Sequence, residues 1–182
     1  MRQTKEIKLF GQRYRLSQIS AAEGFRYMNV KRDATDELMA LIDETAIYVG
    51  GQWQRLTKEN IDNYVKDAID VMQPRLVLKA LVKELNDYNF GFLNTRKTFR
   101  VPSYLRPDHD YEVRQIEGES PVMGVLISEG KATLRELQEY YSLEDAFKIY
   151  DILFVEKLNS AEAHHEAVKK TKSKSGKSTH AY

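Results

Sequence analysis

Residues 140–158 read YYSLEDAFKIYDILFVEKL, and this stretch decides how the C-terminal half of the chain folds. Ser142 followed three residues later by Asp145 predicts a helix start, because the two side chains can satisfy free backbone N–H groups reciprocally. Apolar side chains then recur at helical spacing and define one face of the helix. This face consists of Ala146, Phe147, Tyr150, Leu153, Phe154 and Leu158.

The same stretch carries a second apolar row, formed by Ile149, Ile152 and Val155. A surface helix of a small domain needs only one apolar stripe. The additional apolar row has two interpretations. Either the helix is the central element of its own bundle, or the second row is a docking surface for a partner. The pattern by itself favours neither interpretation.

The predicted helix runs from about Leu143 to about Val168, and residues 169–182 are expected to form a disordered Lys-rich tail. The tail holds five of the 28 basic residues and none of the 27 acidic ones, so the rest of the chain has a small acidic excess. That balance is not typical of nucleic-acid-binding proteins, and we do not expect a nucleic-acid partner. No apolar run is long enough to predict a membrane span.

Two β-hairpins are predicted in the N-terminal third of the chain. Apolar and polar residues alternate over residues 7–16, around a turn at Gly11. The second hairpin, residues 46–56, has a Gly-Gly turn that supplies the positive φ values a tight turn requires. We expect Trp53 and Leu56 to point with the flanking apolar residues of this hairpin.

Helical periodicity predicts helices over residues 20–30, 33–44, 57–73, 74–88 and 133–141, with capping boxes at Ser20–Glu23 and Thr133–Glu136. The span 57–73 has the most regular apolar spacing of all. Pro74 ends that helix and opens the next, which is rich in Leu and Val. The stretch VMGVLIS, residues 122–128, fits a short strand and a helical turn equally well.

Together these elements predict an α+β fold, mostly α-helical, in which the two hairpins pack on a helical bundle. Residues 1–93 are expected to form an N-terminal domain of hairpins and helices, and residues 122–168 a C-terminal helical region. The irregular connection between them, residues 94–121, loses periodicity. Such a connection is a functional loop, a mobile segment or a misread pair of short strands. The tail, residues 169–182, completes the chain.

Motifs for catalysis and for cofactor binding are missing from the sequence. The chain has no cysteine, which excludes disulfides and thiolate ligands. Glu162 and His165 form an E-x-x-H pair on one helical face, but a di-metal bundle needs two such pairs and two further carboxylates. We therefore expect no enzymatic activity, no metal and no cofactor.

The aromatic side chains around the connection admit two interpretations. These residues are Tyr88, Phe90, Phe92, Phe99, Tyr104 and Tyr111, with Arg96, Lys97 and Arg100 among them. Aromatic and basic residues in this mixture can stack on nucleic-acid bases. They can equally anchor a loop on the helical core, which is the interpretation favoured here because no nucleic-acid-binding motif frames them.

Three stretches resemble the tail assembly chaperones of long-tailed bacteriophages. The first, KEIKLFGQRYRLSQISAAEGFRYM (5–28), is a hairpin with a central Gly that runs into a helix. The second is IYVGGQWQRLTKENIDNYVKDAID (47–70) together with VLKALVKELNDYNFGFL (77–93). The third is EGKATLRELQEYYSLEDAFKIYDILFVEKLNSAEAHHEA (129–167), which contains the G-x-A-T-L and YSLED runs associated with such proteins.

The resemblance implies a non-enzymatic protein of the host cell cytoplasm. Such chaperones coat the long helical tape measure protein until tail tube subunits polymerise around it, and they are absent from the finished virion. The implied partners are the tape measure protein and the tail tube protein, and self-association is a further alternative. No membrane partner is expected.

Under this hypothesis the partner surface consists of Ile149, Ile152 and Val155, together with Phe90 and Phe92 from the aromatic loop. Two alternatives remain open. One is a structural component of a phage tail or baseplate. The other is a nucleic-acid-binding regulatory protein that uses Lys169–Lys177 and the aromatic loop.

Overall fold

The computed structural model describes residues 1–29, 34–106 and 119–175, the side chains of 34–37 and 172–175 excepted. Residues 107–118 of the predicted connection, and the predicted tail beyond Ser175, lie outside these ranges. The strands are β1 (Thr4–Leu9), β2 (Gln12–Ser17), β3 (Thr45–Val49) and β4 (Gln52–Arg55). The helices are α1 (Ala21–Asn29), α2 (Ala34–Ile42), α3 (Ile61–Tyr64), α4 (Pro74–Phe90), α5 (Pro121–Ser128), α6 (Leu134–Glu139) and α7 (Leu143–Ser175), with 3-10 turns η1 (Gly91–Asn94) and η2 (Ser103–Leu105).

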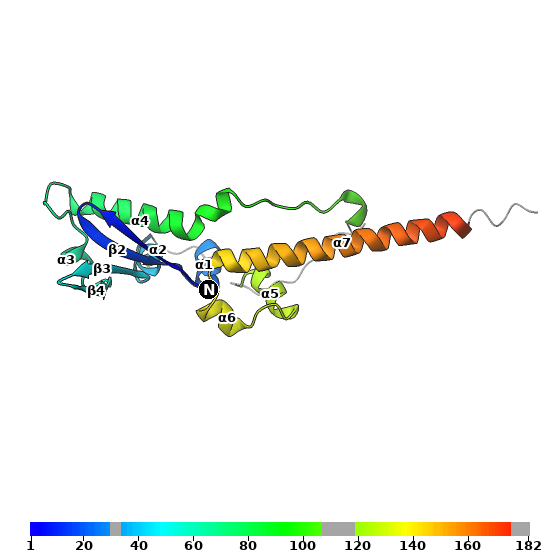
Figure 1. Ribbon diagram of the computed structural model, residues 1–182, viewed down its shortest axis with the longest axis horizontal. Helices are drawn as coiled ribbons and strands as arrows, with labels where there is room; N and C mark the ends of the chain where they lie inside the picture. Colours follow the sequence, from blue (N-terminus) through cyan, green and yellow to red (C-terminus); the bar gives the residue numbers. More distant parts are fainter. Residues whose placement is uncertain (30–33, 107–118, 176–182) are drawn as a thin grey trace, which may run out of the picture.

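The predicted α+β fold is confirmed, and the two hairpins join into one antiparallel sheet of order β1-β2-β3-β4. Their junction is the pairing of β2 with β3, which places Tyr14 opposite Ile47. The turn of the first hairpin has positive φ at both Phe10 and Gly11, which matches the twist of the strands beside it. Figure 1 shows the sheet and α4 at one end of an elongated molecule, with α7 extending to the other.

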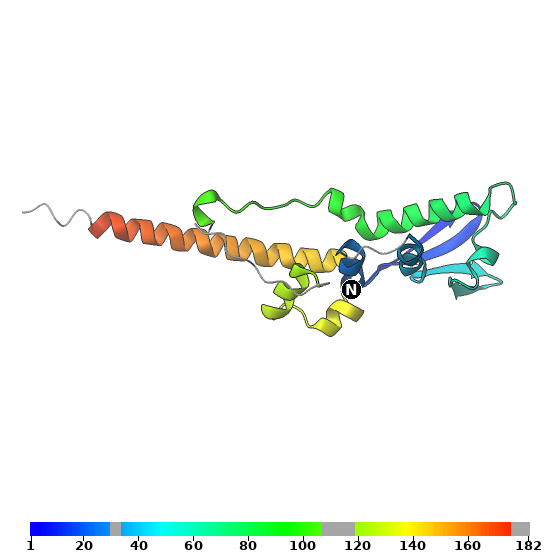
Figure 2. The same cartoon turned by 180° about the vertical axis from the view of Figure 1, so that it is seen from behind.

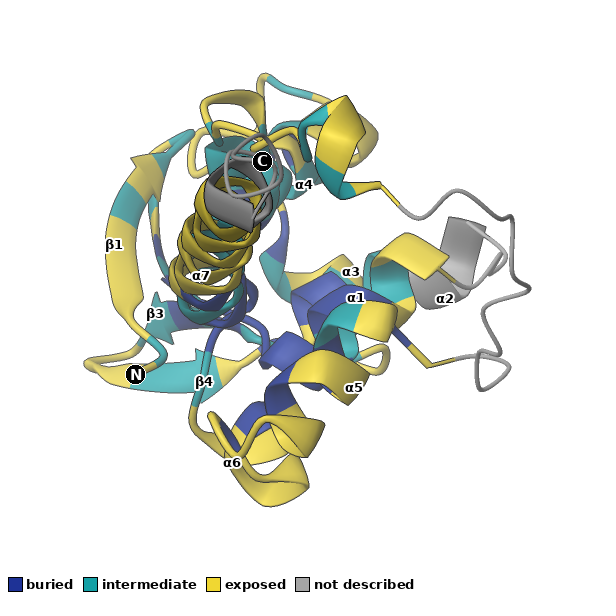
Figure 3. Cartoon of the chain, turned by 90° about the vertical axis from the view of Figure 1, so that its right-hand side faces the viewer, coloured by how far each residue is buried: buried dark blue, intermediate teal, exposed yellow. Residues whose placement is uncertain are grey.

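Two clusters of buried apolar side chains hold the elements together. The first lies between one face of the sheet and helices α2 and α4, and its largest members include Tyr14, Leu16, Ile47, Leu81 and Leu85. The second joins α1, α5, α6 and the start of α7 through residues that include Phe25, Met123, Leu126, Leu137 and Phe147. Figure 3 shows buried residues, coloured dark blue, in α1 and α5. Helix α1 therefore packs with the C-terminal helices, although it follows β2 in the chain.

A glycine allows this close packing of α1 against α7. A Cβ atom at Gly24 would lie 2.9 Å from the Cβ of Leu143, which is too close for two carbon atoms. Glycine inside a helix costs about 1 kcal/mol relative to alanine, and here the shorter approach of the helices offsets that cost. The predicted cap is present, because the amide of Glu23 donates to the hydroxyl of Ser20 at 3.2 Å. Met28, near the end of α1, is 46% exposed.

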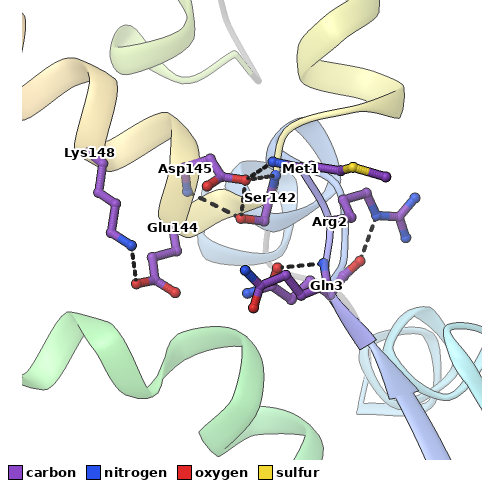
Figure 4. A network of polar contacts seen from close by, with 8 residues as sticks. Met1, Arg2, Gln3, Ser142, Glu144, Asp145 and Lys148 are labelled. Carbon is purple, nitrogen blue, oxygen red and sulfur yellow. Dashed lines mark hydrogen bonds and ion pairs between the residues drawn. The ribbon is translucent and has the colours of Figure 1, made fainter. Parts of the chain in front are cut away.

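The start of α7 is fixed by the predicted cap and by the first residues of the chain (Figure 4). The hydroxyl of Ser142 accepts from the amide of Asp145 at 3.2 Å, and it donates to the Asp145 carboxylate at 2.9 Å. The same carboxylate accepts from the Ser142 amide and pairs with the N-terminal ammonium of Met1 at 2.9 Å. The amide of Arg2 donates to the carbonyl of Tyr140. The N-terminal segment and α7 are thus held at one point.

This cap predicts a loss of stability in acid. Burial alone would raise the pKa of Asp145, but hydrogen bonds from the terminal ammonium and from Ser142 outweigh it and hold the pKa below 3.8. A lowered carboxyl pKa contributes stability above the unfolded value, and the contribution disappears as pH falls through the folded value. We expect Asp145→Asn to reduce the change in unfolding free energy between about pH 5 and pH 2, measured by urea denaturation. An unchanged pH dependence would contradict this account of the cap.

The predicted helix over residues 57–73 is wrong, because only Ile61–Tyr64 is helical. The carboxylate of Asp67 accepts from the backbone amides of Ile69, Val71 and Met72 at 2.9–3.3 Å, which bends the chain into a loop. The amide of Ala68 donates to the carbonyl of Phe10 and so ties this loop to the first hairpin. Most of the residues with this regular apolar spacing therefore lie in a loop and not on one face of a helix. One of them, Ile69, is 76% exposed.

One alternative that the sequence left open is settled by the structure, and two further predictions are corrected. Residues 122–128 lie in helix α5, which settles the choice between strand and helix. Helix α7 continues to Ser175, so residues 169–175 are helical and not part of a disordered tail. Trp53 lies opposite Tyr48 on the sheet face away from the first cluster, while Leu56 is fully buried. Positions three apart on a strand point to opposite faces.

Helix α4, which was predicted as a Leu- and Val-rich helix, packs into the first cluster. Val77, Leu81, Leu85 and Asn89 form its buried side, whereas Leu78 and Val82 are half-buried. The side-chain oxygen of Asn89 accepts from the amide of Ile19 at 2.8 Å. This polar contact links the segment after β2 to the end of α4.

Tyr14 is the one side chain of the described residues whose buried polar atom lacks a hydrogen-bond partner. Burial raises the pKa of its hydroxyl to about 12. Leaving such a group unpaired costs about 1–3 kcal/mol. We expect Tyr14→Phe to leave the free energy of unfolding unchanged or to raise it by about 1 kcal/mol, measured by urea denaturation. A loss of stability of that size would show that the hydroxyl is paired in solution.

Candidate partner-binding surface along helix α7

The first half of α7 packs on the second cluster through its predicted apolar face. Ala146, Phe147 and Leu153 are buried, and Tyr150, Phe154 and Leu158 are half-buried. Beyond Leu158 almost every residue up to Thr171 is exposed. Figure 3, which looks along α7 from its C-terminal end, shows the half nearest the viewer mostly in the colour of exposed residues. The second cluster therefore anchors α7 through its N-terminal turns.

The middle residue of the second apolar row, Ile152, lies on the side of α7 that faces solvent. Ile152 is 70% exposed, and Ile149 and Val155 are half-buried on either side of it. Residues three apart are separated by about 60° around a helix, so the three side chains form one shallow apolar strip. Ile149 also packs against the second cluster. Because Ile152 is left open, α7 is not enclosed as the central helix of a bundle.

Residues 95–106, called the strap below, run beside α7 in both views of the ribbon (Figures 1 and 2). The guanidinium of Arg96 makes two hydrogen bonds to the carboxylate of Asp151, at 2.9 and 2.5 Å. The hydrogen bond to Asp151 raises the pKa of Arg96 above its ordinary value, although burial opposes the shift. The rings of Phe99 and Phe154 stack at 6.3 Å. Part of the predicted irregular connection is thus fastened along the helix.

A groove of about 300 Å³ opens between the strap and the first turns of α7. Its apolar lining comes from Phe92, Phe99 and Phe147. Its polar rim includes Lys97 and Lys148, and the Arg96–Asp151 pair closes one side. The Arg96 guanidinium lies over the Phe147 ring at 4.4 Å, so the rim and the lining are held in place together.

The predicted site residues occupy two different environments. Ile149, Ile152 and Val155 share the solvent-facing strip, and Phe92 lies in the groove with its ring 5.8 Å from Phe147. Phe90 is not part of this surface, because it stacks on Tyr27 at 4.8 Å between the two clusters. The sequence indicated Arg96 only as one of the basic residues of the aromatic loop. It did not indicate Asp151 or their pairing, because the two residues are 55 positions apart and share no local pattern.

Other candidate chemistry is taken up by structural contacts. Glu162 accepts a hydrogen bond from Tyr104 at 3.2 Å, and the His165 ring packs on Tyr104 at 4.9 Å. The E-x-x-H pair therefore holds the end of the strap.

In the part of the chain that the structure describes, no group of three metal-ligating side chains occurs. Nor does any described helix have the length and apolar character needed to cross a membrane.

Comparison with protein-family models, with curated proteins and with solved structures finds no match for this chain.

Proposed function

We propose that this chain is a non-enzymatic tail assembly chaperone of a long-tailed bacteriophage. In this role it binds the tape measure protein in the host cytoplasm and keeps it soluble until tube subunits assemble around it. The observation that carries the proposal is the apolar strip on the open side of α7, where Ile152 is 70% exposed. The resemblance of residues 129–167 to such chaperones agrees with it.

The client expected for this role is a long helix with apolar stripes. A helix of that kind binds other proteins by laying its apolar side chains into a groove or onto a helix face. The α7 strip offers the helix face, and the neighbouring groove of about 300 Å³ offers space for one or two large side chains. Lys97 on the rim suits an acidic residue that flanks an apolar stripe, whereas Lys148 is already paired with Glu144 at 2.8 Å.

The size of the surface favours weak, reversible binding. Each large apolar side chain that becomes fully buried contributes about 1.5–3 kcal/mol. Three such side chains supply at most about 9 kcal/mol, and association itself costs about 4–15 kcal/mol. A single site is therefore weak, and coverage of a long client requires many copies. Weak sites also allow tube subunits to displace the chaperone.

The proposal is tested by co-expression with a long helical phage tape measure protein, followed by purification through a tag on the tape measure protein. The expected result is co-purification of the two proteins in a ratio of many copies of this chain per client. A client that elutes alone would overturn the proposal. Mass spectrometry of purified phage particles distinguishes the alternative of a structural tail or baseplate component, since a chaperone is absent from them.

A further inference from the structure

The sheet has one face buried and one face open. The buried face carries Tyr14, Leu16 and Ile47 into the first cluster. Because side chains alternate along a strand, the residues between them point to the opposite side. That open face carries Glu6, Lys8, Arg13, Arg15, Tyr48, Trp53 and Arg55, which the strand pairings place on adjacent strands. None of these residues belongs to either apolar cluster.

The open face is strongly basic in a chain whose body is not. It holds four cationic side chains and the single carboxylate of Glu6. Arg15 donates to one Glu6 oxygen at 2.7 Å and Arg13 to the other at 3.3 Å. One carboxylate is thus shared by two guanidinium groups, each of which carries several N–H donors. The side chains of Arg13 and Arg15 are 51% and 37% exposed.

Two aromatic rings adjoin these arginines. The rings of Tyr48 and Trp53 meet edge to face at 5.2 Å across the β3–β4 pairing. The guanidinium of Arg13 lies 4.5 Å from the centre of the Tyr48 ring, and that of Arg15 lies 4.1 Å from the centre of the Trp53 ring. These contacts hold the flat guanidinium groups in fixed positions on the sheet.

We propose that this open face binds single-stranded nucleic acid, separately from the client surface of α7. Phosphates match the cationic side chains, and flat guanidinium and aromatic groups match unpaired bases. The exposed face of a four-stranded sheet is a surface on which known RNA-binding modules stack about two or three bases. A duplex is a poorer fit because its bases are already stacked, and an acidic peptide would leave both rings unused.

The site contains its own reporter, since Trp53 is the single tryptophan of the chain. We expect titration of the full-length protein with single-stranded DNA or RNA of about twelve nucleotides to quench its fluorescence. The apparent Kd is expected to rise steeply between about 50 and 200 mM salt. Separate DNA and RNA titrations show which of the two the site prefers. Absence of quenching by both at the lower salt concentration overturns the proposal.

Matched variants locate the site. Arg13→Gln with Arg15→Gln is expected to weaken binding about tenfold, whereas Lys169→Gln with Lys170→Gln, which removes the same charge from α7, changes it less than about twofold. Trp53→Leu is expected to weaken binding about tenfold in anisotropy measurements with a labelled oligonucleotide. Circular dichroism verifies that each variant is folded, and the wild-type titration does not depend on that check.

Three outcomes would contradict the assignment. Equal weakening by the α7 lysine variant would place binding on the C-terminal helix. Displacement of the oligonucleotide by polyglutamate of equal charge would show a general anion-binding face. Binding of duplex DNA as tightly as single strands would remove the role of the rings. Single-stranded recognition is supported if the α7 lysine variant changes binding less than about twofold and polyglutamate does not displace the oligonucleotide. Duplex DNA should also bind at least about tenfold more weakly than single strands.

Discussion

Replacing Ile152 and Val155 together by Asp is expected to abolish the ability of this chain to keep the tape measure protein soluble. Two charges would then stand on the strip that is proposed to meet an apolar client, and burying an unpaired charge costs far more than one apolar contact contributes. Because Ile152 is 70% exposed and Val155 half-buried, the fold itself should tolerate the change. The measurement is the soluble fraction of the client after co-expression.

The matched control places the same two charges on the same helix, as Asn159→Asp with Ser160→Asp. Both positions are exposed and polar in the wild-type protein. The control is expected to retain full client solubility, with unchanged circular dichroism in both variants. If the strip variant still keeps the client soluble, the strip is not the client surface. Unfolding of the strip variant would show that Ile152 and Val155 serve the core.

The largest effect on stability is expected from Leu143→Ala. Leu143 is 1% exposed, belongs to the second cluster and packs directly against Gly24. Truncating a buried leucine in this way costs about 3 kcal/mol, within a range of about 2.7–5 kcal/mol, because the space left behind is only partly filled. The free energy of unfolding from urea denaturation measures the loss.

Ile152→Ala is the control for that substitution, since it removes a similar side chain from the exposed side of the same helix. A surface truncation of this kind changes the free energy of unfolding by less than about 0.5 kcal/mol. Equal losses at both positions would contradict the described burial of α7. A small loss at Leu143 would show that α1 closes the space above it.

Local signals predicted the elements that are held by local contacts. The cap Ser142–Asp145 and the capping box Thr133–Glu136 each satisfy backbone groups within one turn, so three residues of spacing are enough to predict them. The hairpin turn at Gly11 depends likewise on neighbouring residues. These features carry most of the predicted fold class.

Side-chain contacts to the backbone and contacts between distant segments account for what the sequence did not predict here. The spacing of residues 57–73 is helical, but Asp67 binds three amides of its own loop and Ala68 pairs with the first hairpin. Both contacts are made by backbone amides, so the spacing of apolar residues in the sequence does not reveal them. The strap is likewise fastened to α7 by the Arg96–Asp151 pair, which spans 55 residues and follows no repeat.

The second apolar row of α7 was predictable, whereas the basic sheet face was not. Ile149, Ile152 and Val155 stand three apart on one helix, so their surplus over a single stripe shows in the sequence. The members of the basic face gather only when β2 pairs with β3, and that pairing joins two hairpins separated by two helices. The net charge of the whole chain is close to zero, because acidic residues elsewhere offset the basic residues of this face. The net charge therefore does not reveal the basic face.

The most direct test of the central proposal is the solubility of the tape measure protein expressed with and without this chain. Centrifugation of lysates and quantification of the client in supernatant and pellet give the result. The account predicts that the client is mostly in the pellet when expressed alone and mostly in the supernatant when this chain is present. Equal solubility in the two conditions would contradict it.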